Sequence, residues 1–416
     1  VPGLEGHQGL ASFPQAYLSG MGRRGRILGD SGRNGNGNWL WADSWDEGAG
    51  DRIVTDAVLF VMGRTRRQHE TLLREVETLL GEAIDVVHRV DCAFVKKSKT
   101  GKPDKTIEHF GFRDGISQPV MRGTQRHARG ASDANTVNPG EFILGYQDNK
   151  KLFAPSPHLL EYNDPAQELP LPADMLPERF ADFSDRRSDK RDLGRNGSFL
   201  VIRELQQDVE GFWENARVKA EKVAEERPDL GGDIDADWIA AKIIGRWKSG
   251  APLVREPKRS DVESDENDFL YGRDDAQGLR CPHGSHIRRS NPRESFNPGS
   301  QASLDIANRH RILRRGRPYI RDEGGEDEEK GLLFCCFNAN IERQFEFVQQ
   351  SWVNAPTFHG LRREPDPLMD PVGKGSFTIP TSNGPIQLND MQTYVTMKGG
   401  GYFFMPGRAT LRYLGI

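Results

Sequence analysis

The sequence has few cysteines, little net charge and no long hydrophobic run. Four cysteines in 416 residues are too few for a disulfide framework, so we expect a reducing compartment. The net charge of −4 gives no basic field that would draw the chain to nucleic acid or to an anionic membrane. The longest purely apolar runs, residues 57–62 and 332–337, are far short of the roughly 20 residues that span a bilayer.

These absences favour a cytoplasmic protein. The chain begins at Val1 rather than at a methionine, so the sequence does not exclude an export signal upstream of Val1. What the sequence has in excess is glycine and proline: 45 and 25 residues, together about 17% of the chain against an average near 12%. This excess predicts many ordered turns and loops rather than an all-helical bundle. A chain of this length is also long enough to bury a sizeable core.

Hydrophobic periodicity predicts an α+β fold in which strands alternate with helices. Residues 53–62 and 83–94 are expected to be strands, and residues 65–80 between them an amphipathic helix. A second set begins with a strand at 198–203 and a helix at 206–216. A strand at 332–337 and a helix at 341–352 follow. The end of the set is predicted as two strands, 394–397 and 402–405, joined as a hairpin by the glycines at 399–401.

We divide the chain into an N-terminal arm and two α+β domains. The arm, residues 1–50, is rich in glycine and asparagine and is expected to be irregular but partly packed. The first domain covers residues 51–195 and the second residues 196–416, with the boundary where a charged stretch gives way to a strand.

The densest cluster of polar ligands runs from Cys281 to Arg293 and contains His283 and His286. Zinc is one interpretation, but zinc needs three or four ligands and no second Cys/His pair lies at the usual spacing. A basic turn with satisfied histidines is a second interpretation. The third is one axial histidine that holds a haem, with nearby arginines pairing the propionates.

Two further strings are ambiguous when each is taken alone. Residues 111–119 contain Asp114 followed by Gly115, which is an ordinary turn signal but also leaves little bulk beside the carboxylate. Residues 310–319 hold a run of arginines. They form either a basic surface strand or a strand that turns one arginine inward, where a buried cation needs a partner or a function.

Taken together and in this order, the three strings resemble the dye-decolorizing peroxidase family of haem enzymes, especially its larger, loop-rich members. The segment 332–352, which ends in Gln-Gln-Ser-Trp, is similar to that family as well. The resemblance covers about residues 50–416. It implies two ferredoxin-like α+β domains with antiparallel sheets and peripheral helices, with haem b held by the C-terminal domain.

The resemblance also implies a role for individual residues. His286 matches the axial iron ligand, Asp114 the distal carboxylate and Arg314 the distal arginine. Such a carboxylate takes the proton of bound hydrogen peroxide and returns it to the leaving oxygen, while the arginine stabilises the negative charge that develops. An acidic optimum for dye oxidation is expected. Further haem neighbours are expected at Gly115, Ile116, Ser117, Gln118 and Arg289, the last through a propionate, and at Phe334 and Phe345.

The position that holds the proximal aspartate in some members of the family aligns with Asn340 here. The hydrogen-bond partner of His286 is therefore expected at Asn340, Glu342 or Glu346.

Expected electron donors are aromatic dyes or phenolic compounds. Mn(II) is an alternative, with the acidic residues 326–329 as its candidate site. A haem-binding or haem-transfer protein without turnover is a further alternative. Bulky donors would need electron transfer through a surface aromatic residue, and the candidates are the eight tyrosines and Trp39, Trp41, Trp45, Trp213, Trp238, Trp247 and Trp352.

Overall fold

The computed structural model describes residues 11–44, 53–92, 96–97, 103–104, 107–173, 189–231, 234–326 and 328–415. Within these ranges, no helix is both long enough and apolar enough to cross a membrane. All four cysteines are free: Cys92 is exposed, whereas Cys281, Cys335 and Cys336 are buried. The expected absence of a disulfide framework is confirmed.

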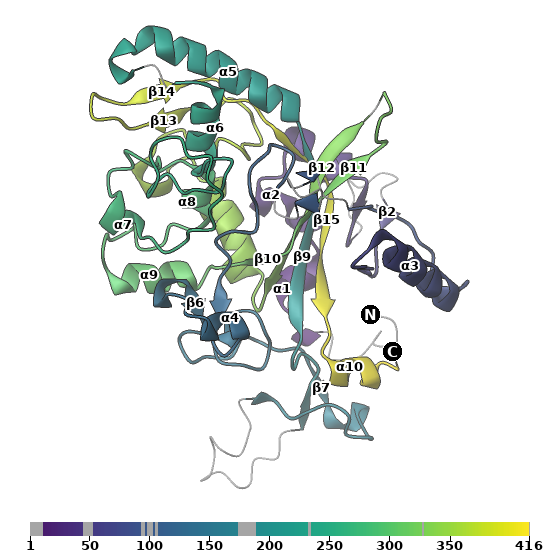
Figure 1. Cartoon of the computed structure of the whole chain (residues 1–416). Helices are drawn as coiled ribbons and strands as arrows, with labels where there is room; N and C mark the ends of the chain where they lie inside the picture. Colours follow the sequence, from purple (N-terminus) through teal and green to yellow (C-terminus); the bar gives the residue numbers. More distant parts are fainter. Residues whose placement is uncertain are drawn as a thin grey trace.

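A seven-stranded mixed sheet forms the centre of the molecule (Figure 1). Its middle is antiparallel: β9 (Ser198–Gln207) pairs with β12 (Glu329–Asn338) on one side and with β15 (Val395–Met405) on the other. The short strands β10 (Leu313–Arg314) and β11 (Arg317–Arg321) share the outer edge of β12. On the opposite side, β1 (Trp41–Ala42) and β2 (Ile53–Val54) extend the sheet in parallel beyond β15.

Helices join and cover these strands, which confirms the α+β class. Helix α5 (Val209–Glu226) follows β9, and its first turn is capped by the Asp208 carboxylate, which accepts the Gly211 N–H. Helix α6 (Ala236–Ile244) packs against α5 and is capped in the same way by Asp235. The predicted helix over 341–352 forms as two π-helical segments, η11 (Glu342–Glu346) and η12 (Val348–Val353), so its hydrogen bonds are wider than we expected.

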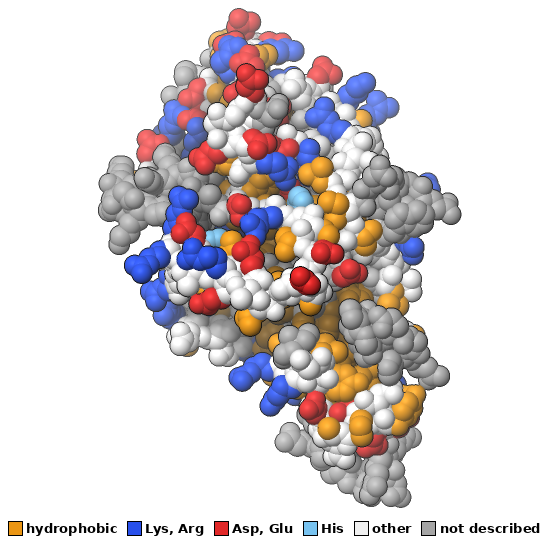
Figure 2. Space-filling view, turned by 90° about the vertical axis from the view of Figure 1, so that its right-hand side faces the viewer, with side chains coloured by type: hydrophobic (Ala, Val, Ile, Leu, Met, Phe, Trp, Pro, Cys, Tyr) orange, Lys and Arg blue, Asp and Glu red, His pale blue; other side chains and the backbone are white. Residues whose placement is uncertain are grey.

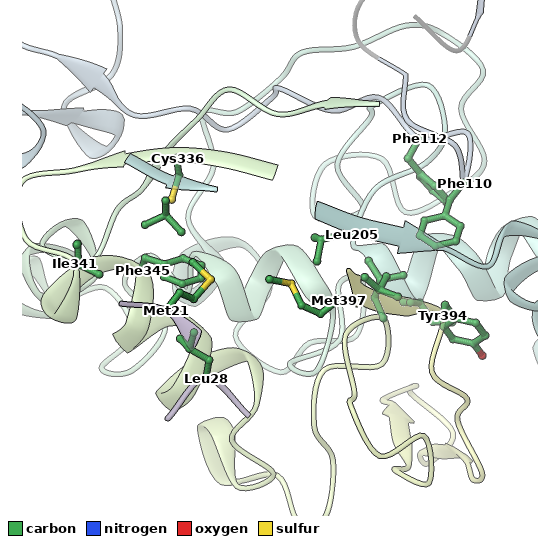
Figure 3. Close-up of a cluster of buried hydrophobic side chains, with 14 of the residues drawn as sticks. Met21, Leu28, Phe110, Phe112, Leu205, Cys336, Ile341, Phe345, Tyr394 and Met397 are labelled. Atoms are coloured by element: carbon green, nitrogen blue, oxygen red, sulfur yellow. The ribbon is translucent and has the colours of Figure 1, made fainter. Parts of the chain in front are cut away.

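The N-terminal arm is part of the main core. Met21 and Leu28 lie beside Ile341, Phe345 and Cys336 in one buried cluster (Figure 3). These arm residues come from η2 (Gly22–Arg24) and α2 (Gly25–Leu28) or their borders. The prediction of a partly packed arm therefore understated how firmly residues 11–44 are held.

The predicted strands at 53–62 and 83–94 are wrong over the residues that the structure describes. Only Ile53–Val54 forms a strand, and Cys92 makes a single isolated bridge to Tyr319. The helix between them is confirmed as α3 (Arg66–Leu80), but none of its residues is buried. Apolar side chains such as Leu59, Met62 and Val86 are exposed on this side of the molecule. Figure 2 shows the face that carries α3, where hydrophobic and charged side chains are mixed. Periodicity finds apolar runs, but it cannot say whether they find a partner.

The predicted hairpin at 399–401 is also wrong. The three glycines lie inside one continuous strand, β15, which has a register shift between Met397 and Gly399. The strand starting at 198 and the one at 332–337 are confirmed and are longer than predicted. The boundary proposed near residues 185–197 falls partly outside the described residues and stays a prediction.

The remaining short elements lie around the sheet. The helices are α1 (Gln15–Ser19), η3 (Gly32–Asn34), η4 (Asn36–Asn38), α4 (Gln125–Ala128), η5 (Asp133–Asn135), η6 (Pro139–Glu141), η7 (Glu161–Asn163), η10 (Pro228–Leu230), α7 (Tyr271–Asp274), α8 (His286–Ser290), α9 (Gln301–Asn308), η13 (Phe358–Gly360) and α10 (Arg408–Tyr413). The strands are β3 (Lys96–Lys97), β4 (Pro103–Asp104), β5 (Val120–Met121), β6 (Thr136–Val137), β7 (His158–Leu160), β8 (Lys190–Asp192), β13 (Phe377–Ile379) and β14 (Ile386–Leu388).

Candidate active site

Asp114 follows directly on a tight hairpin. Ile107 and Arg113 pair as an antiparallel bridge, and Asp114 is the next residue along the chain. Gly115 then takes a φ of 78°, a left-handed conformation that favours glycine, and a Cβ built there would meet nothing within 4 Å. The sequence indicated that Asp-Gly would leave room beside the carboxylate, and the structure confirms this.

Arg314 meets Asp114 from the edge strand β10. Its Nη1 lies 2.8 Å from Asp114 Oδ1, and its Nη2 donates to the carbonyl of Ile116 at 3.1 Å. The backbone N–H of Arg314 donates to the side-chain oxygen of Gln118 at 3.0 Å. Both ends of Arg314 are thus fixed by the 114–118 loop. The neighbouring Arg315 instead donates to the carbonyl of Arg314, so Arg314 is the arginine that faces the carboxylate.

Opposing influences act on the pKa of Asp114, and the net effect lowers it. Burial alone would raise the pKa, but the Arg314 guanidinium outweighs burial, helped by the N–H of Gly115 and by the charge of His286. The pKa of Asp114 therefore lies below its usual value, and the side chain is a carboxylate at neutral pH.

His286 is the first residue of α8, and its partner is Asp366. The ring nitrogen Nδ1 lies 2.9 Å from Asp366 Oδ2. The other oxygen of Asp366 accepts the N–H groups of Leu368 and Met369 at 2.9 and 3.1 Å. Burial raises the pKa of Asp366, but the charge and hydrogen bond of His286, the charge of Arg289 and the N–H of Leu368 together outweigh burial and lower it. An ionised Asp366 keeps a proton on Nδ1 and leaves Nε2 as the ring nitrogen that can bind a metal.

The three residues predicted as the partner of His286 are engaged elsewhere, so that prediction is wrong. The Asn340 side chain accepts the N–H of Arg343, and Glu342 accepts the N–H of Ala16. Glu346 pairs with Arg24 and accepts the hydroxyl of Tyr402. Asp366 lies 80 residues beyond His286 in a loop flanked by prolines, where no local pattern marks it as a site.

Arg289 does not have the role that we expected. Its buried guanidinium donates to the carbonyls of Trp352, Val353 and Ala355 at 2.6, 3.1 and 3.0 Å, and also to that of Glu364. The four carbonyls bond to the two terminal nitrogens, while the buried Nε has no partner among the described residues, so the guanidinium binds the backbone of this segment. Arg289 instead ties helix α8 to the segment that leads into Asp366, and so it supports the His286–Asp366 pair.

Three other arginines are buried without an acidic partner among the described residues. Arg246 and Arg293 both donate to the side-chain oxygen of Asn267, at 3.3 and 2.6 Å, and otherwise bond chiefly to backbone carbonyls. Arg311 donates to the carbonyl of Ser117 at 2.9 Å. Burial, followed by the charges of Arg293 and Arg314, lowers the pKa of Arg311 to about 9. Buried cations without a counter-ion are costly, so this cluster fits a ligand that brings negative charge.

The other predicted neighbours lie around the same loop or on the sheet beside it. Ile116 and Gln118 are buried, and Ser117 has a φ of 66° and donates its hydroxyl to Asn267 at 2.9 Å. Phe334 on β12 and Phe345 on η11 have ring centroids 6.2 Å apart in the main core cluster. The sequence missed Arg246 and Asn267 as members of the site because they come from loops without a regular period, whereas Arg293 ends the basic string at 281–293 but was not singled out.

The side chains of His286, Asp114 and Arg314 are partly exposed to solvent. They keep 29%, 30% and 31% of their side-chain surface exposed, whereas Asp366 keeps 1%. Since the charge of His286 also acts on the pKa of Asp114, the two side chains lie within electrostatic range of each other. The site therefore offers a nitrogen donor, an acid–cation pair and a cluster of buried arginines within electrostatic range of one another. This donor set fits haem, which has one iron and two propionates.

The predicted Mn(II) site and surface radical sites receive less support. Glu328 pairs with Lys330, and Glu329 pairs with Arg321 and Lys398. Among the residues that the structure describes, no group of three His, Cys, Asp or Glu is placed to hold a metal ion. Of the predicted tryptophans, Trp45 lies outside the described residues. Trp213 and Trp238 are partly buried, and Trp39, Trp41, Trp247 and Trp352 are buried.

Comparison with known proteins agrees with this geometry. Residues 183–384 match the C-terminal region of the Dyp-type peroxidases. The multifunctional dye peroxidase DyP2 of Amycolatopsis sp. is 32% identical over 381 residues, which cover 86% of this chain and 71% of that protein. The dye-decolorizing peroxidase of Mycena epipterygia is 29% identical, and the match covers 87% of this chain and 66% of that protein.

Solved structures of the same class share the fold. The DyP-type peroxidase of Anabaena sp. superposes with a TM-score of 0.64 at 25% identity, covering 95% of this chain and 73% of that one. DyP2 of Amycolatopsis sp. superposes with a TM-score of 0.66 at 25% identity, covering 96% and 78%. Fold and relatives thus define a peroxidase of the haem type. The chain belongs to the dye-decolorizing peroxidase family.

Proposed function

We propose that this chain binds haem b through His286, reduces hydrogen peroxide, and takes electrons from aromatic dyes or phenolic compounds. One observation carries the proposal: the chain presents an Asp114–Arg314 pair and a His286–Asp366 pair within electrostatic range of each other, each with its own supporting hydrogen bonds. When bound, haem would supply the two electrons that reduce peroxide and would recover them from the donors one at a time.

The distal pair acts on peroxide. Hydrogen peroxide is a poor acid, so it needs a base within reach to take its proton and an acid to protonate the leaving oxygen. Asp114 is ionised and partly exposed, so it can accept that proton and then give it up. Arg314 stays charged and stabilises the negative charge that builds up as the O–O bond breaks. Its bond to the carbonyl of Ile116 keeps it in place when Asp114 is protonated.

The proximal pair holds the ring of His286. Asp366 fixes the tautomer because a carboxylate beside Nδ1 requires a proton there, which leaves the lone pair on Nε2. The negative charge of Asp366 also makes the imidazole a stronger donor to a metal. Arg289 and the N–H groups of Leu368 and Met369 keep Asp366 from turning away.

Arg311, Arg293 and Arg246 would hold the haem propionates. This assignment replaces Arg289, whose terminal nitrogens are occupied by carbonyls. A propionate at Arg311 would supply the counter-ion that this buried guanidinium lacks among the described residues. Gly115 and Ser117 leave room beside the loop backbone, because neither places a bulky side chain there.

A titration of the purified chain with haem tests the proposal. We expect a one-to-one complex with a Soret band, a change of that band on adding hydrogen peroxide, and bleaching of an anthraquinone dye at acidic pH. A chain that takes up no haem would contradict the proposal outright. A chain that binds haem but does not react with peroxide would be a haem carrier. The Asp114–Arg314 pair argues against a carrier, since transport needs neither an acid nor a cation on the open side. Oxidation of Mn(II) has no described site in its favour.

A further inference from the structure

Glu108 occupies the tip of the hairpin that presents Asp114. Its carboxylate folds back into the hairpin, where Oε2 accepts the N–H of Phe110 at 2.8 Å and Oε1 accepts the N–H of Phe112 at 2.9 Å. The backbone closes the same loop, because the Glu108 N–H donates to the Phe112 carbonyl at 3.1 Å. From the sheet, the Gln207 side-chain amide donates to Oε2 at 2.8 Å. One carboxyl group thus joins the hairpin to the end of β9.

The surroundings of Glu108 contain neutral donors and no paired cation. Glu141, Glu204 and Glu346 each pair with an arginine, whereas Glu108 forms no ion pair within the described ranges. The charge that acts on it is that of Asp114, which has the same sign. From α5 it is faced by Trp213, whose indole donates to the Phe110 carbonyl at 3.2 Å. Lys248 lies over the Trp213 ring, but its ammonium pairs with Asp237 at 2.7 Å. His109 turns away and bonds to the Tyr319 carbonyl.

The hairpin is also held by packing of its aromatic side chains. Phe110 and Phe112 enter the core beside the end of β9 (Figure 3). There Phe110 packs on Phe212 with ring centroids 4.6 Å apart, and Phe112 stacks on Trp213 at 6.2 Å. With the backbone anchored on both sides, a change in the charge of Glu108 acts on Asp114 through its electric field and through the N–H groups of the tip.

We propose that Glu108 is a positioning residue that fixes Asp114 and, through its own charge, tunes the reaction of the Asp114–Arg314 pair with peroxide. The inference rests on the proposed function. A carboxylate has about four acceptor sites, and three are filled here, so a proton can bind the remaining site at Oε1 and leave the hairpin intact. Glu108 therefore changes charge without changing the fold.

The pKa of Glu108 sets the pH at which its charge changes. Burial raises the pKa of Glu108 to about 7, opposed by the three N–H donors and assisted by the charge of Asp114. Below neutral pH, Glu108 is uncharged and Asp114 bears the only negative charge of the pair. Above it, a second negative charge opposes the charge that Arg314 must stabilise. We expect the peroxide reaction to slow by about three- to tenfold across this step, which corresponds to about half to one pKa unit of coupling.

The test follows the rate of the peroxide-induced Soret change between pH 5 and pH 9 in the haem-loaded protein. Glu108→Gln keeps an acceptor oxygen but carries no charge, so its profile should lose the step near pH 7 and match wild type at pH 5. Glu108→Asp has a shorter side chain and should react more slowly at every pH while still binding haem. Exposed Glu225→Gln is the matched control and should behave as wild type. Superimposable profiles for Glu108→Gln and wild type would refute the inference, as would wild-type rates for Glu108→Asp.

A second variant keeps the test decisive if Glu108→Gln fails to fold. Gln207→Leu removes one N–H donor that favours the charged form, so the step should move to a higher pH. A step that stays in place would overturn the inference. These outcomes are distinct from failure of the proposed function, in which wild-type protein would show no peroxide reaction at any pH. A purely structural role for Glu108 would lower the thermal midpoint of its variants and leave the shape of every pH profile unchanged, which also contradicts the inference.

Discussion

The two acids of the active site, Asp114 and Asp366, carry the same charge but differ in solvent exposure and in their hydrogen-bond partners. Asp114 is 30% exposed and bonds to the guanidinium of Arg314. Asp366 is 1% exposed and bonds to an imidazole and two backbone N–H groups. In both, a positive partner lowers the pKa against the effect of burial. The difference indicates that an acid that exchanges protons with a substrate must stay accessible, whereas one that only orients a ligand is best enclosed.

The largest effect is expected from removing His286, the proposed iron ligand. His286→Ala should abolish haem binding, because the chain then loses its only proposed iron ligand, and the Soret band should not form. His127→Ala, on the peripheral helix α4, is the control and should bind haem fully. Full haem binding by His286→Ala would move the ligand to another histidine, His283 or His310.

The next largest effect is expected from Asp114, the exposed acid. Asp114→Asn should leave haem bound but slow the peroxide reaction by about 10²- to 10⁴-fold, the usual contribution of a positioned acid–base group. Stopped-flow recording of the Soret band measures this directly. A wild-type rate in Asp114→Asn would show that proton transfer does not pass through the exposed acid, and the comparison between the two acids would lose its basis.

Asp366, the enclosed acid, should affect the rate of the peroxide reaction less than Asp114 does and the donor strength of His286 more. Asp366→Asn keeps the size of the side chain but removes its charge, so we expect a loss of about 10- to 100-fold in haem affinity or peroxide reactivity. The reduction potential should rise at the same time, because a weaker imidazole donor stabilises the oxidised metal less. An unchanged potential would argue against a role of Asp366 in the donor strength of His286.

A smaller effect is expected at the cluster of buried arginines. Arg311→Met removes a charged donor of the kind that contributes about 1.5 to 3 kcal/mol, so haem should be transferred to apomyoglobin about tenfold faster or more. Arg315→Met, on the exposed side of the same segment, is the matched control. Equal transfer rates for the two variants would remove Arg311 from the propionate site.

The smallest effect concerns stability in acid. Because the folded pKa of Asp114 lies below its unfolded value near 3.9, its ion pair stabilises the fold above that value, and this contribution is lost as the pH falls through the folded pKa. The urea midpoint should therefore drop between pH 5 and pH 3 by more in wild type than in Asp114→Asn. Parallel midpoints would mean that Arg314 does not lower the pKa of Asp114.

The residues with local sequence signatures were the predictable part of the site. Asp114 beside Gly115, His286 within its basic string and Arg314 before a strand all follow from short patterns, and the structure places them within electrostatic range of one another. Asp366 could not be found in this way, since it reaches His286 only through a fold that closes 80 residues of chain. Arg289 was misassigned because sequence shows a charge but not the four carbonyls that occupy it.

The same limit applies to the fold. The central strands β9 and β12 were recognisable because both of their faces are apolar over a long run. The described parts of the other two predicted strands, residues 53–62 and 83–92, are also rich in apolar side chains yet lie largely exposed, because pairing depends on what lies opposite a strand rather than on its own composition. The glycines of β15 suggested a turn, but they fit the close approach of neighbours such as Trp41 and Ile202.

The packing of the arm also determines when the protein can be completed during synthesis. Arg24 pairs with Glu346, which is 322 residues further along the chain, and Asp43 accepts the N–H of Tyr402, which is 359 residues further. At a translation rate of about 5 to 20 residues per second, the arm leaves the ribosome about 20 to 70 s before its last partner. During that interval Met21, Leu28 and Trp41 have no core to enter, so a nascent chain should be a client of chaperones until β15 is released.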